Sequence, residues 1–543
     1  MTDQEPGPPT DHPEAGKSSA TGAPKPVAVH PPVAPPAAGP WPAPGPSIGA
    51  APPRPLPGQP PTLPPLTVWP AAVWPLDREA AAPPAALLTA GLAGLVDASL
   101  YWPDRPGLWV GLSALAVLLA ALAARRPSGR QLRWAALTIL LFAVSTVRTA
   151  EWLDLLCVLA GLLTAVLTVT AGRTWTGLLT GVVSGPAAGF RTLNWARRGL
   201  APRLRGRELP VGRLLTVVGI SIVLLLVFGT LFASADPVFA RLAAAAVPSL
   251  EFGPVVVRLV IFGTVAAVAL TGACLASQSP RFDELAPERG RPRARAEWAV
   301  PLGALVALFG CFVGVQLVVL ADGAGHVLET AGLSYADYAR QGFWQLLAVT
   351  ALTLVVVAVV VRVAGRETRG DQALLRWLLG ALCVLAVLVV ATALRRMWLY
   401  EDAYGFTRLR LLVQAVEVWL GLVFALICAA GIRLRGRWLP RTIVATGALT
   451  VLALAALNPD GFIADQNVHR YTETGRIDLG YLSGLSPDAA PPLDRLPEPQ
   501  RSCVLGTLEY QLATGEPWYA ANLGRARART LLHDHPPGAC ATS

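Results

Sequence analysis

Long apolar stretches follow one another along the chain from residue 85 to residue 457, and short polar loops separate them. A helix needs about 20 residues to cross the hydrocarbon core of a bilayer, and most of the stretches reach that length. The sequence therefore predicts an all-α fold, a polytopic α-helical membrane bundle of about 11 transmembrane helices. The predicted spans are 85–102, 107–124, 134–149, 151–171, 214–234, 255–276, 299–321, 342–363, 374–394, 409–432 and 440–457.

Arginines mark every second loop between these spans. Cytoplasmic loops of membrane proteins carry the excess of Lys and Arg, so the basic loops are predicted to face the cytoplasm. This places the N-terminus in the cytoplasm and the C-terminus on the extracytoplasmic side. The segment 175–190 is apolar but contains Gly185 and Pro186, and as a span it would turn all later basic loops outward. It is therefore predicted to be broken there and to lie at the membrane interface.

Two polar segments flank the apolar part and divide the chain into three domains, 1–84, 85–457 and 458–543. More than half of the 49 prolines precede residue 85. Such a proline-rich segment buries too little apolar surface to fold, so 1–84 is predicted to be a disordered cytoplasmic tail. It is interpreted as a tether, with a ligand for an SH3-type domain as the alternative.

The segment 458–543 is predicted to be a small helical extracytoplasmic subdomain that docks on the membrane part. A short helix near 460–472 should end at Gly475, and Ser486 is a plausible helix cap. Two amphipathic helices are predicted at about 497–513 and 517–533.

Composition agrees with a membrane protein, since 53% of residues are hydrophobic and only 15% are charged. The lipid bilayer is thus the first predicted partner. The formal charge of +10 comes almost entirely from arginines in short loops. They do not cluster on a soluble domain with interleaved aromatic residues, so no nucleic-acid partner is predicted.

The seven cysteines fall into two groups. Five lie singly in apolar stretches and are interpreted as small core residues. Cys503 and Cys540 share the outer tail, where thiols oxidise, so a disulfide between them is favoured over two free thiols. No Cys/His ligand spacing and no catalytic motif is present, so the sequence predicts no metal site, no cofactor and no catalytic residue.

The polar patch "RRMWLYEDAYGFTRLR", Arg395 to Arg410, lies between two apolar stretches and faces outward in this topology. Arg410, Gln414 and Glu417 share one face of the next span, with Glu417 about two turns into the membrane. Intramembrane charges either pair to fix helix packing or form a substrate or proton site. The aromatic residues could equally form an interfacial belt.

We predict one outward-facing constellation, covered by the segment 458–493, whose arginines pair with Asp478, Asp488 or an external anion. Its candidate ligand- or partner-binding residues are Tyr335, Tyr338, Arg340, Arg396, Tyr400, Glu401, Tyr404, Arg408, Arg410, Glu417, Asn458, Asn467, Asp478, Tyr481 and Asp488.

Three motifs, "YADYARQGFWQL", "LYEDAYGFTRLR" and "NPDGFIADQNVHRY…GRIDLGYLSGLSPDAAP", resemble those of bacterial multi-pass membrane proteins in the domain of unknown function 4173 family, with its related 4153 group. The resemblance covers residues 85–495 or so. Its most specific positions are Asn458, Asn467, Asp478, Tyr481, Leu482, Ser486 and Asp488. It implies an integral protein of a bacterial cell membrane, and it transfers no activity.

The favoured function is a membrane-embedded sensor, scaffold or assembly partner that binds another membrane or cell-surface protein through the outward site. The alternative is a permease that uses Glu417 and the outer arginines to carry a small solute. An enzyme ranks third. The sequence predicts no particular oligomeric state.

Overall fold

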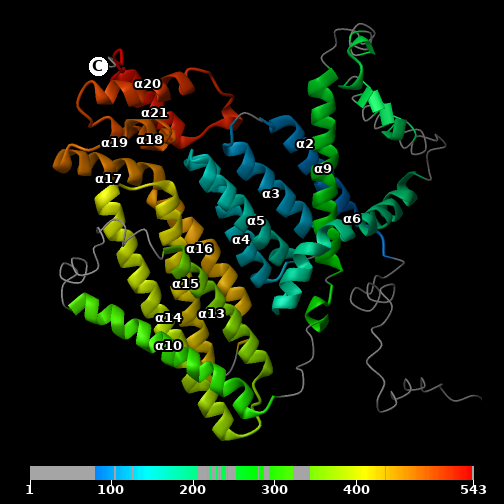
Figure 1. The fold of residues 1–543 in the computed structure, drawn as a ribbon. Coiled ribbons are helices and arrows are strands. Elements are labelled where there is room, and N and C mark those ends of the chain that lie inside the picture. Colours follow the sequence, from blue (N-terminus) through cyan, green and yellow to red (C-terminus); the bar gives the residue numbers. More distant parts are fainter. Residues whose placement is uncertain are drawn as a thin grey trace, which may run out of the picture. The chain divides into compact units, whose positions relative to one another are not determined.

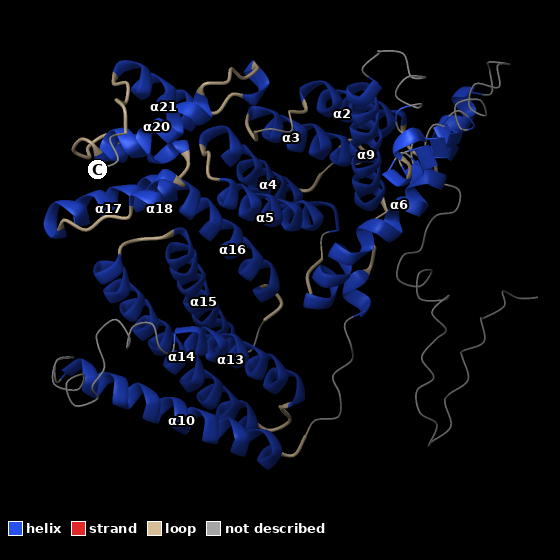
Figure 2. Ribbon diagram, turned by 45° about the horizontal axis from the view of Figure 1, so that its top comes forward, coloured by secondary structure: helices blue, strands red, loops and turns tan. Residues whose placement is uncertain are grey.

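The computed structural model describes residues 80–540 except 103–104, 125–126, 171, most of 205–251, 279, 286–292, 322–342 and 434–435. Within these described ranges the chain is helical and contains no strand, apart from an isolated bridge between Arg293 and Ala364 (Figure 2). The predicted all-α class is therefore confirmed for this part of the chain.

Before residue 458 the described part of the chain consists mainly of helices, and most of them are apolar. They are α2 Pro84–Leu100, α3 Leu108–Leu122, α4 Gly129–Val147, α5 Glu151–Thr170, α6 Trp175–Leu204, α9 Phe252–Ser277, α10 Arg295–Ala321, α13 Phe343–Val363, α14 Arg369–Tyr404, α15 Arg408–Arg433 and α16 Leu439–Leu457 (Figure 1). A short 3₁₀ turn, η1, covers Phe282–Leu285.

Among the described helices, seven are long and apolar enough to span a membrane, namely α5, α9, α10, α13, α14, α15 and α16. The apolar helices α2 and α3 are shorter. The chain is thus a membrane protein with several apolar helices, but the predicted count of about 11 spans is not established. The predicted span 214–234 falls in a region where only scattered residues are described.

Two boundaries differ from the sequence prediction. Helix α6 is continuous from Trp175 to Leu204, so the predicted break at Gly185 and Pro186 is wrong. Proline removes one backbone hydrogen bond, and a neighbouring turn can compensate in an apolar helix. Helix α14 continues through most of the polar patch to Tyr404, so only three residues, 405–407, separate it from α15. At 36 residues α14 is about 54 Å long, more than a bilayer core requires.

The helices pack in neighbouring groups. Helix α2 packs against α3 and α9, while α4 packs against α5, and α16 contacts both α4 and α5. Helix α14 packs against α15 and α10, and α13 joins this group. Leu375, Leu382 and Phe424 are fully buried in the core that these last helices share.

The C-terminal residues 458–540 form a cap on one end of α4, α5, α15 and α16 (Figure 1). The cap comprises α17 Pro459–Thr474, α18 Leu479–Ser483, η2 Pro487–Ala489, α19 Ala490–Leu493, α20 Gln500–Leu512, η3 Trp518–Ala520 and α21 Leu523–Asp534. The predicted stop at Gly475 is present, because Gly475 adopts φ 66°, which suits glycine at a helix end. The predicted helices at about 497–513 and 517–533 correspond to α20 and α21.

The cap shares its hydrophobic core with the membrane helices. Leu482, Leu493 and Leu505 from the cap belong to the same buried cluster as Leu141 of α4 and Leu153 of α5. All five side chains are almost completely buried. The cap therefore buries its apolar surface by docking on the helix ends.

Candidate functional site

Asp460 is the centre of the contacts between the cap and the membrane helices. It lies in the first turn of α17, after Pro459, and its side chain is fully buried. Its carboxylate accepts hydrogen bonds from Arg408 Nε at 2.9 Å, from Trp152 Nε1 at 3.2 Å and from the Ser486 backbone N–H at 2.8 Å. A second guanidinium nitrogen of Arg408 completes a bidentate ion pair.

The electrostatics of Asp460 follow from these donors. Burial alone would raise the pKa of this carboxyl, but Arg408 and the Ser486 amide outweigh it and lower the pKa below the ordinary value. The positive N-terminal end of α17 also favours a carboxylate at this position. Asp460 is therefore ionised and neutralised inside the protein. The predicted carboxylate partners of the arginines were Asp478 and Asp488, whereas Arg408 pairs with Asp460.

Two of the candidate residues predicted from the sequence hold the turn between α14 and α15 in place. The Asn467 side chain accepts a hydrogen bond from the Phe406 N–H at 3.2 Å and donates to the Phe406 carbonyl at 2.9 Å. The Tyr481 hydroxyl oxygen accepts the Arg408 backbone N–H at 2.7 Å. Gly405 has φ 80°, and a Cβ there would meet the Asn467 side chain. The turn is thus shaped to dock against α17 and α18.

Asp488 and Asn522 fasten the cap to the turn between α4 and α5. The Asp488 carboxylate accepts the Thr149 N–H at 2.6 Å, and the Thr149 hydroxyl accepts the Asp488 N–H at 3.1 Å. Asn522 donates to the carbonyls of Ser145 and Arg148, both at 2.7 Å. These contacts satisfy backbone groups at the ends of two helices. Burial raises the pKa of Asp488 although the Thr149 donors oppose the shift.

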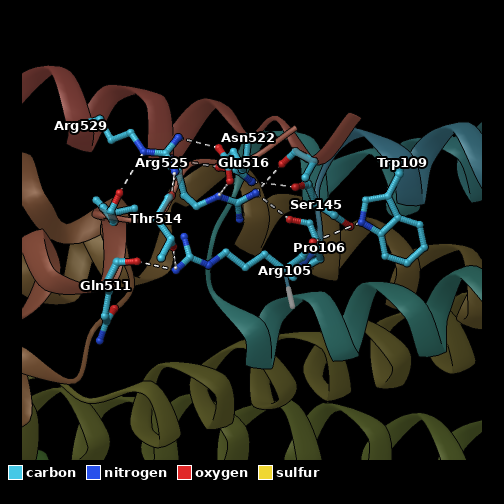
Figure 3. A network of polar contacts seen from close by, with 12 residues as sticks. Arg105, Pro106, Trp109, Ser145, Gln511, Thr514, Glu516, Asn522, Arg525 and Arg529 are labelled. Atoms are coloured by element: carbon cyan, nitrogen blue, oxygen red, sulfur yellow. Dashed lines mark hydrogen bonds and ion pairs between the residues drawn. The ribbon is translucent and has the colours of Figure 1, made fainter. Parts of the chain in front are cut away.

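A second ion-pair network lies within the cap, and hydrogen bonds connect it to the segment that leads into α3 (Figure 3). The Glu516 carboxylate accepts hydrogen bonds from Arg525 Nε and Arg529 Nη1, each at 2.7 Å. The Arg525 and Glu516 side chains are only 5% and 9% exposed. Arg525 also donates to the carbonyl of Pro106 at 3.0 Å, and Arg105 donates to Thr514 at 3.2 Å and to the Gln511 carbonyl. Burial lowers the pKa of Arg525, and Glu516 offsets part of that shift.

The aromatic part of the patch lies on the last turns of α14. The rings of Tyr400 and Tyr404 are 4.9 Å apart, and the Arg410 guanidinium lies 4.2 Å from the centre of the Tyr400 ring. Arg410 also donates to the Gly405 carbonyl. Arg396 donates to Gln316 of α10 at 2.9 Å. These arginines therefore have contacts within the protein.

Two glutamates are buried between α14 and α15. Glu401 is 0% exposed and Glu417 is 3% exposed. Gln414 donates to one carboxylate oxygen of Glu401. No described residue forms a hydrogen bond with Glu401 Oε1 or Glu417 Oε2. Buried polar atoms without a partner are costly, and carboxylate oxygens of Asp97 and Asp154 share this property.

The remaining sequence candidates have local roles or fall outside the described residues. Asp478 caps α18 by accepting the Tyr481 N–H at 2.9 Å. Asn458 has a left-handed conformation between α16 and α17, with φ 58°. Tyr335, Tyr338 and Arg340 lie outside the described residues.

Several contact residues were missed from the sequence. They are Asp460, Trp152, Thr149, Asn522, Glu516 and Arg525. Asp460 carries a local signal, because an acid that follows Pro459 is typical of the first turn of a helix, and so does Asn522, which caps the N-terminus of α21. The contacts of Trp152 and Thr149 are with distant parts of the chain.

A disulfide joins Cys503 and Cys540, whose Cα atoms are 4.5 Å apart, and it ties the start of α20 to the end of the cap. Among the described residues, no group of three or more His, Cys, Asp or Glu side chains could hold a metal ion. The chemistry of the described site is the neutralisation of buried charges and the capping of helix ends.

Comparison with known proteins identifies the family. No curated protein and no solved structure matches the chain. The family model described as "Domain of unknown function (DUF4153)" matches residues 135–496. The family is thus the 4153 group rather than the 4173 family named first from the motifs, and the match starts later than residue 85. It begins within α4 and extends through α16 and the cap as far as Leu496. Since the match covers more than half of the sequence, the chain belongs to the DUF4153 family.

Proposed function

We propose that the protein is a scaffold of a bacterial cell membrane, in which the cap is a fixed platform that binds another membrane or cell-surface protein on the extracytoplasmic side. One observation carries this proposal: the buried charges Asp460 and Glu516 of the cap are already neutralised inside the protein. Asp460 pairs with Arg408 of α15, and Glu516 pairs with Arg525 and Arg529 of the cap itself. Groups that are already neutralised hold a structure in place and are not free for a ligand.

The cap offers exposed aromatic side chains for a partner. Tyr510 is 85% exposed and Trp518 is 68% exposed. Tyrosine and tryptophan are enriched at the centres of protein interfaces because they bury a large area at a small entropy cost. We propose that these two residues belong to the contact surface of the platform.

The extracytoplasmic orientation is supported by the basic residues at the opposite helix ends. The cap contacts the C-terminal ends of α4 and α16 and the N-terminal end of α5. Five arginines gather around the other ends of these helices. They are Arg130, Arg133, Arg173, Arg437 and Arg441. Arginine-rich ends face the cytoplasm, so the cap is assigned to the other side.

A permease is the second candidate, and the buried pair Glu401 and Glu417 favours it. Each of these buried carboxyls has one oxygen without a hydrogen bond among the described residues, and such groups in a membrane bundle are suited to carry a proton or to bind a cation. A permease must open this region to each side of the membrane in turn. A scaffold has no such requirement, so accessibility distinguishes the two functions.

The test is labelling of a single cysteine at the half-buried Gln414, beside Glu401, in a protein whose five free cysteines are replaced by alanine. An impermeant thiol reagent is added to right-side-out and inside-out vesicles. A scaffold should be labelled from the outside only. Thr442→Cys, in the first turn of α16 near Arg441, is the matched control and should be labelled from the inside only.

The other outcomes reject parts of the proposal. Labelling of Gln414→Cys from both sides would favour the permease. Labelling of this residue from the inside only, or of the Thr442→Cys control from the outside, would reverse the orientation.

A further inference from the structure

The arginines opposite the cap surround one hollow of about 640 Å³. Arg130 and Arg133 come from the first turns of α4, Arg173 precedes α6, and Arg437 and Arg441 flank the start of α16. Segments that are about 300 residues apart in the sequence therefore bring five positive charges together. The basic loops are visible in the sequence, but the sequence alone does not show that their arginines come together in space.

The described acidic residues balance only part of the charge of this cluster, because Asp283 attracts Arg441. Arg441 donates to the Gly172 carbonyl at 2.6 Å, a neutral acceptor. The side chains of Arg130, Arg133, Arg173 and Arg437 form no ion pair with a described residue. Asp283 is nearby, but its Oδ1 accepts the backbone N–H groups of Arg173 and Thr174 and the Thr174 hydroxyl.

The helix ends add to the positive potential. Helices α4, α6 and α16, of 19, 30 and 19 residues, all begin at this hollow. The N-terminal end of a helix is positive, so it stabilises an anion and disfavours an arginine. The negative end of α5 at Thr170 offsets part of this potential, but the five arginines still repel one another and the three positive helix ends. An anion in the hollow removes this repulsion.

We propose that this arginine cluster binds the headgroup of an anionic phospholipid of the surrounding membrane. The location selects a lipid over a free anion, because the arginines lie at the ends of apolar helices and Trp438, 40% exposed, lines the same hollow. Basic pockets between membrane helices on the cytoplasmic side are suited to lipid headgroups that carry phosphate. The site is distinct from the cap and does not depend on the scaffold proposal.

The test uses the full-length protein in detergent, with diphosphatidylglycerol and phosphatidylcholine of identical acyl chains as probes, and native mass spectrometry as the measurement. The wild type should bind diphosphatidylglycerol more tightly than phosphatidylcholine. The triple variant R130Q/R133Q/R437Q should lose about tenfold to a hundredfold of this preference. The matched control R362Q/R369Q/R376Q removes three exposed arginines outside the hollow and should keep the preference.

A second readout separates lipid binding from a folding defect. Without lipid, the R130Q/R133Q/R437Q variant should unfold at the same temperature as the wild type or a higher one, because like charges have been removed. Added diphosphatidylglycerol should raise the unfolding temperature of the wild type and of the control variant but not that of the cluster variant. Inorganic phosphate should not displace the lipid.

Three results would overturn the proposal. The first is an unchanged lipid preference in the cluster variant, and the second is an equal loss in the control variant, which would indicate general charge attraction. The third is displacement of the lipid by inorganic phosphate, which would identify a soluble anion as the ligand.

Discussion

Replacing Arg408 by alanine should lower the free energy that holds the cap on the helix ends by about 3–5 kcal/mol at neutral pH, because the buried Asp460 would lose the positive charge that neutralises it. The expected result is faster hydrogen exchange of α17 in the full-length protein. Helix α10, which does not contact Asp460, should exchange as in the wild type.

Arg495→Ala is the matched control for this change. Arg495 pairs with Asp465 in the same cap, but the two side chains are 58% and 47% exposed. Exposed ion pairs contribute about 0–1 kcal/mol, so this variant should exchange like the wild type. Equal effects of the two substitutions would show that Asp460 does not hold the cap.

The pH dependence gives a further check on the same pair. The folded protein lowers the pKa of Asp460, so the stabilisation is complete above the pKa of the unfolded chain, about 3.9, and is lost as the pH falls through the lower folded value. In Arg408→Ala, burial is no longer opposed by Arg408 and raises the pKa of Asp460, so the difference between wild type and variant should be largest near about pH 8 and should shrink as the pH falls and the carboxyl takes up a proton. A difference that grows as the pH falls from about 8 to about 5 would contradict the assignment.

Replacing Glu516 by alanine should destabilise the part of the cap around α21, which contacts the segment before α3 through Arg525, by about 3–5 kcal/mol. Arg525 would remain buried with a positive charge and without its carboxylate, and Arg529 would lose the same partner. The measurement is the rate of limited proteolysis between α20 and α21, which should rise. The expected cut lies near Trp518, the exposed residue that follows Glu516.

Glu509→Ala provides the comparison for Glu516. Glu509 is an exposed acid of α20. Surface substitutions of this kind usually change stability by less than about 0.5 kcal/mol. If both variants are cut at the wild-type rate, the Glu516 network makes no measurable contribution to the position of the cap.

The sequence predicted those features that depend on local periodicity. Apolar stretches of membrane length became helices, and Gly475 ended α17 because glycine tolerates a left-handed conformation. The selection of Asn467, Tyr481 and Asp488 came from a motif, and these residues do contact the turns of the membrane helices. The motif identified these residues, but it did not predict the residues with which they form hydrogen bonds.

Pairing across the chain could not be predicted in the same way. Asp460 and Arg408 are separated by 52 residues, and Asn522 and Ser145 by 377. Which arginine reaches which carboxylate depends on how far each helix extends. The sequence prediction ended the span of α14 at residue 394, whereas the helix continues to Tyr404 and brings Arg408 to the first turn of α17.

Hydrogen exchange of the wild-type protein in bilayer discs tests most directly whether the cap is fixed on the helix ends. The backbone amides of α17 and α20 should exchange about as slowly as those in the cap-side half of α15, since the three helices contribute to one buried core. Exchange of α17 and α20 that is orders of magnitude faster than that of α15 would contradict a fixed platform, because it would show that the cap separates from the membrane helices on its own.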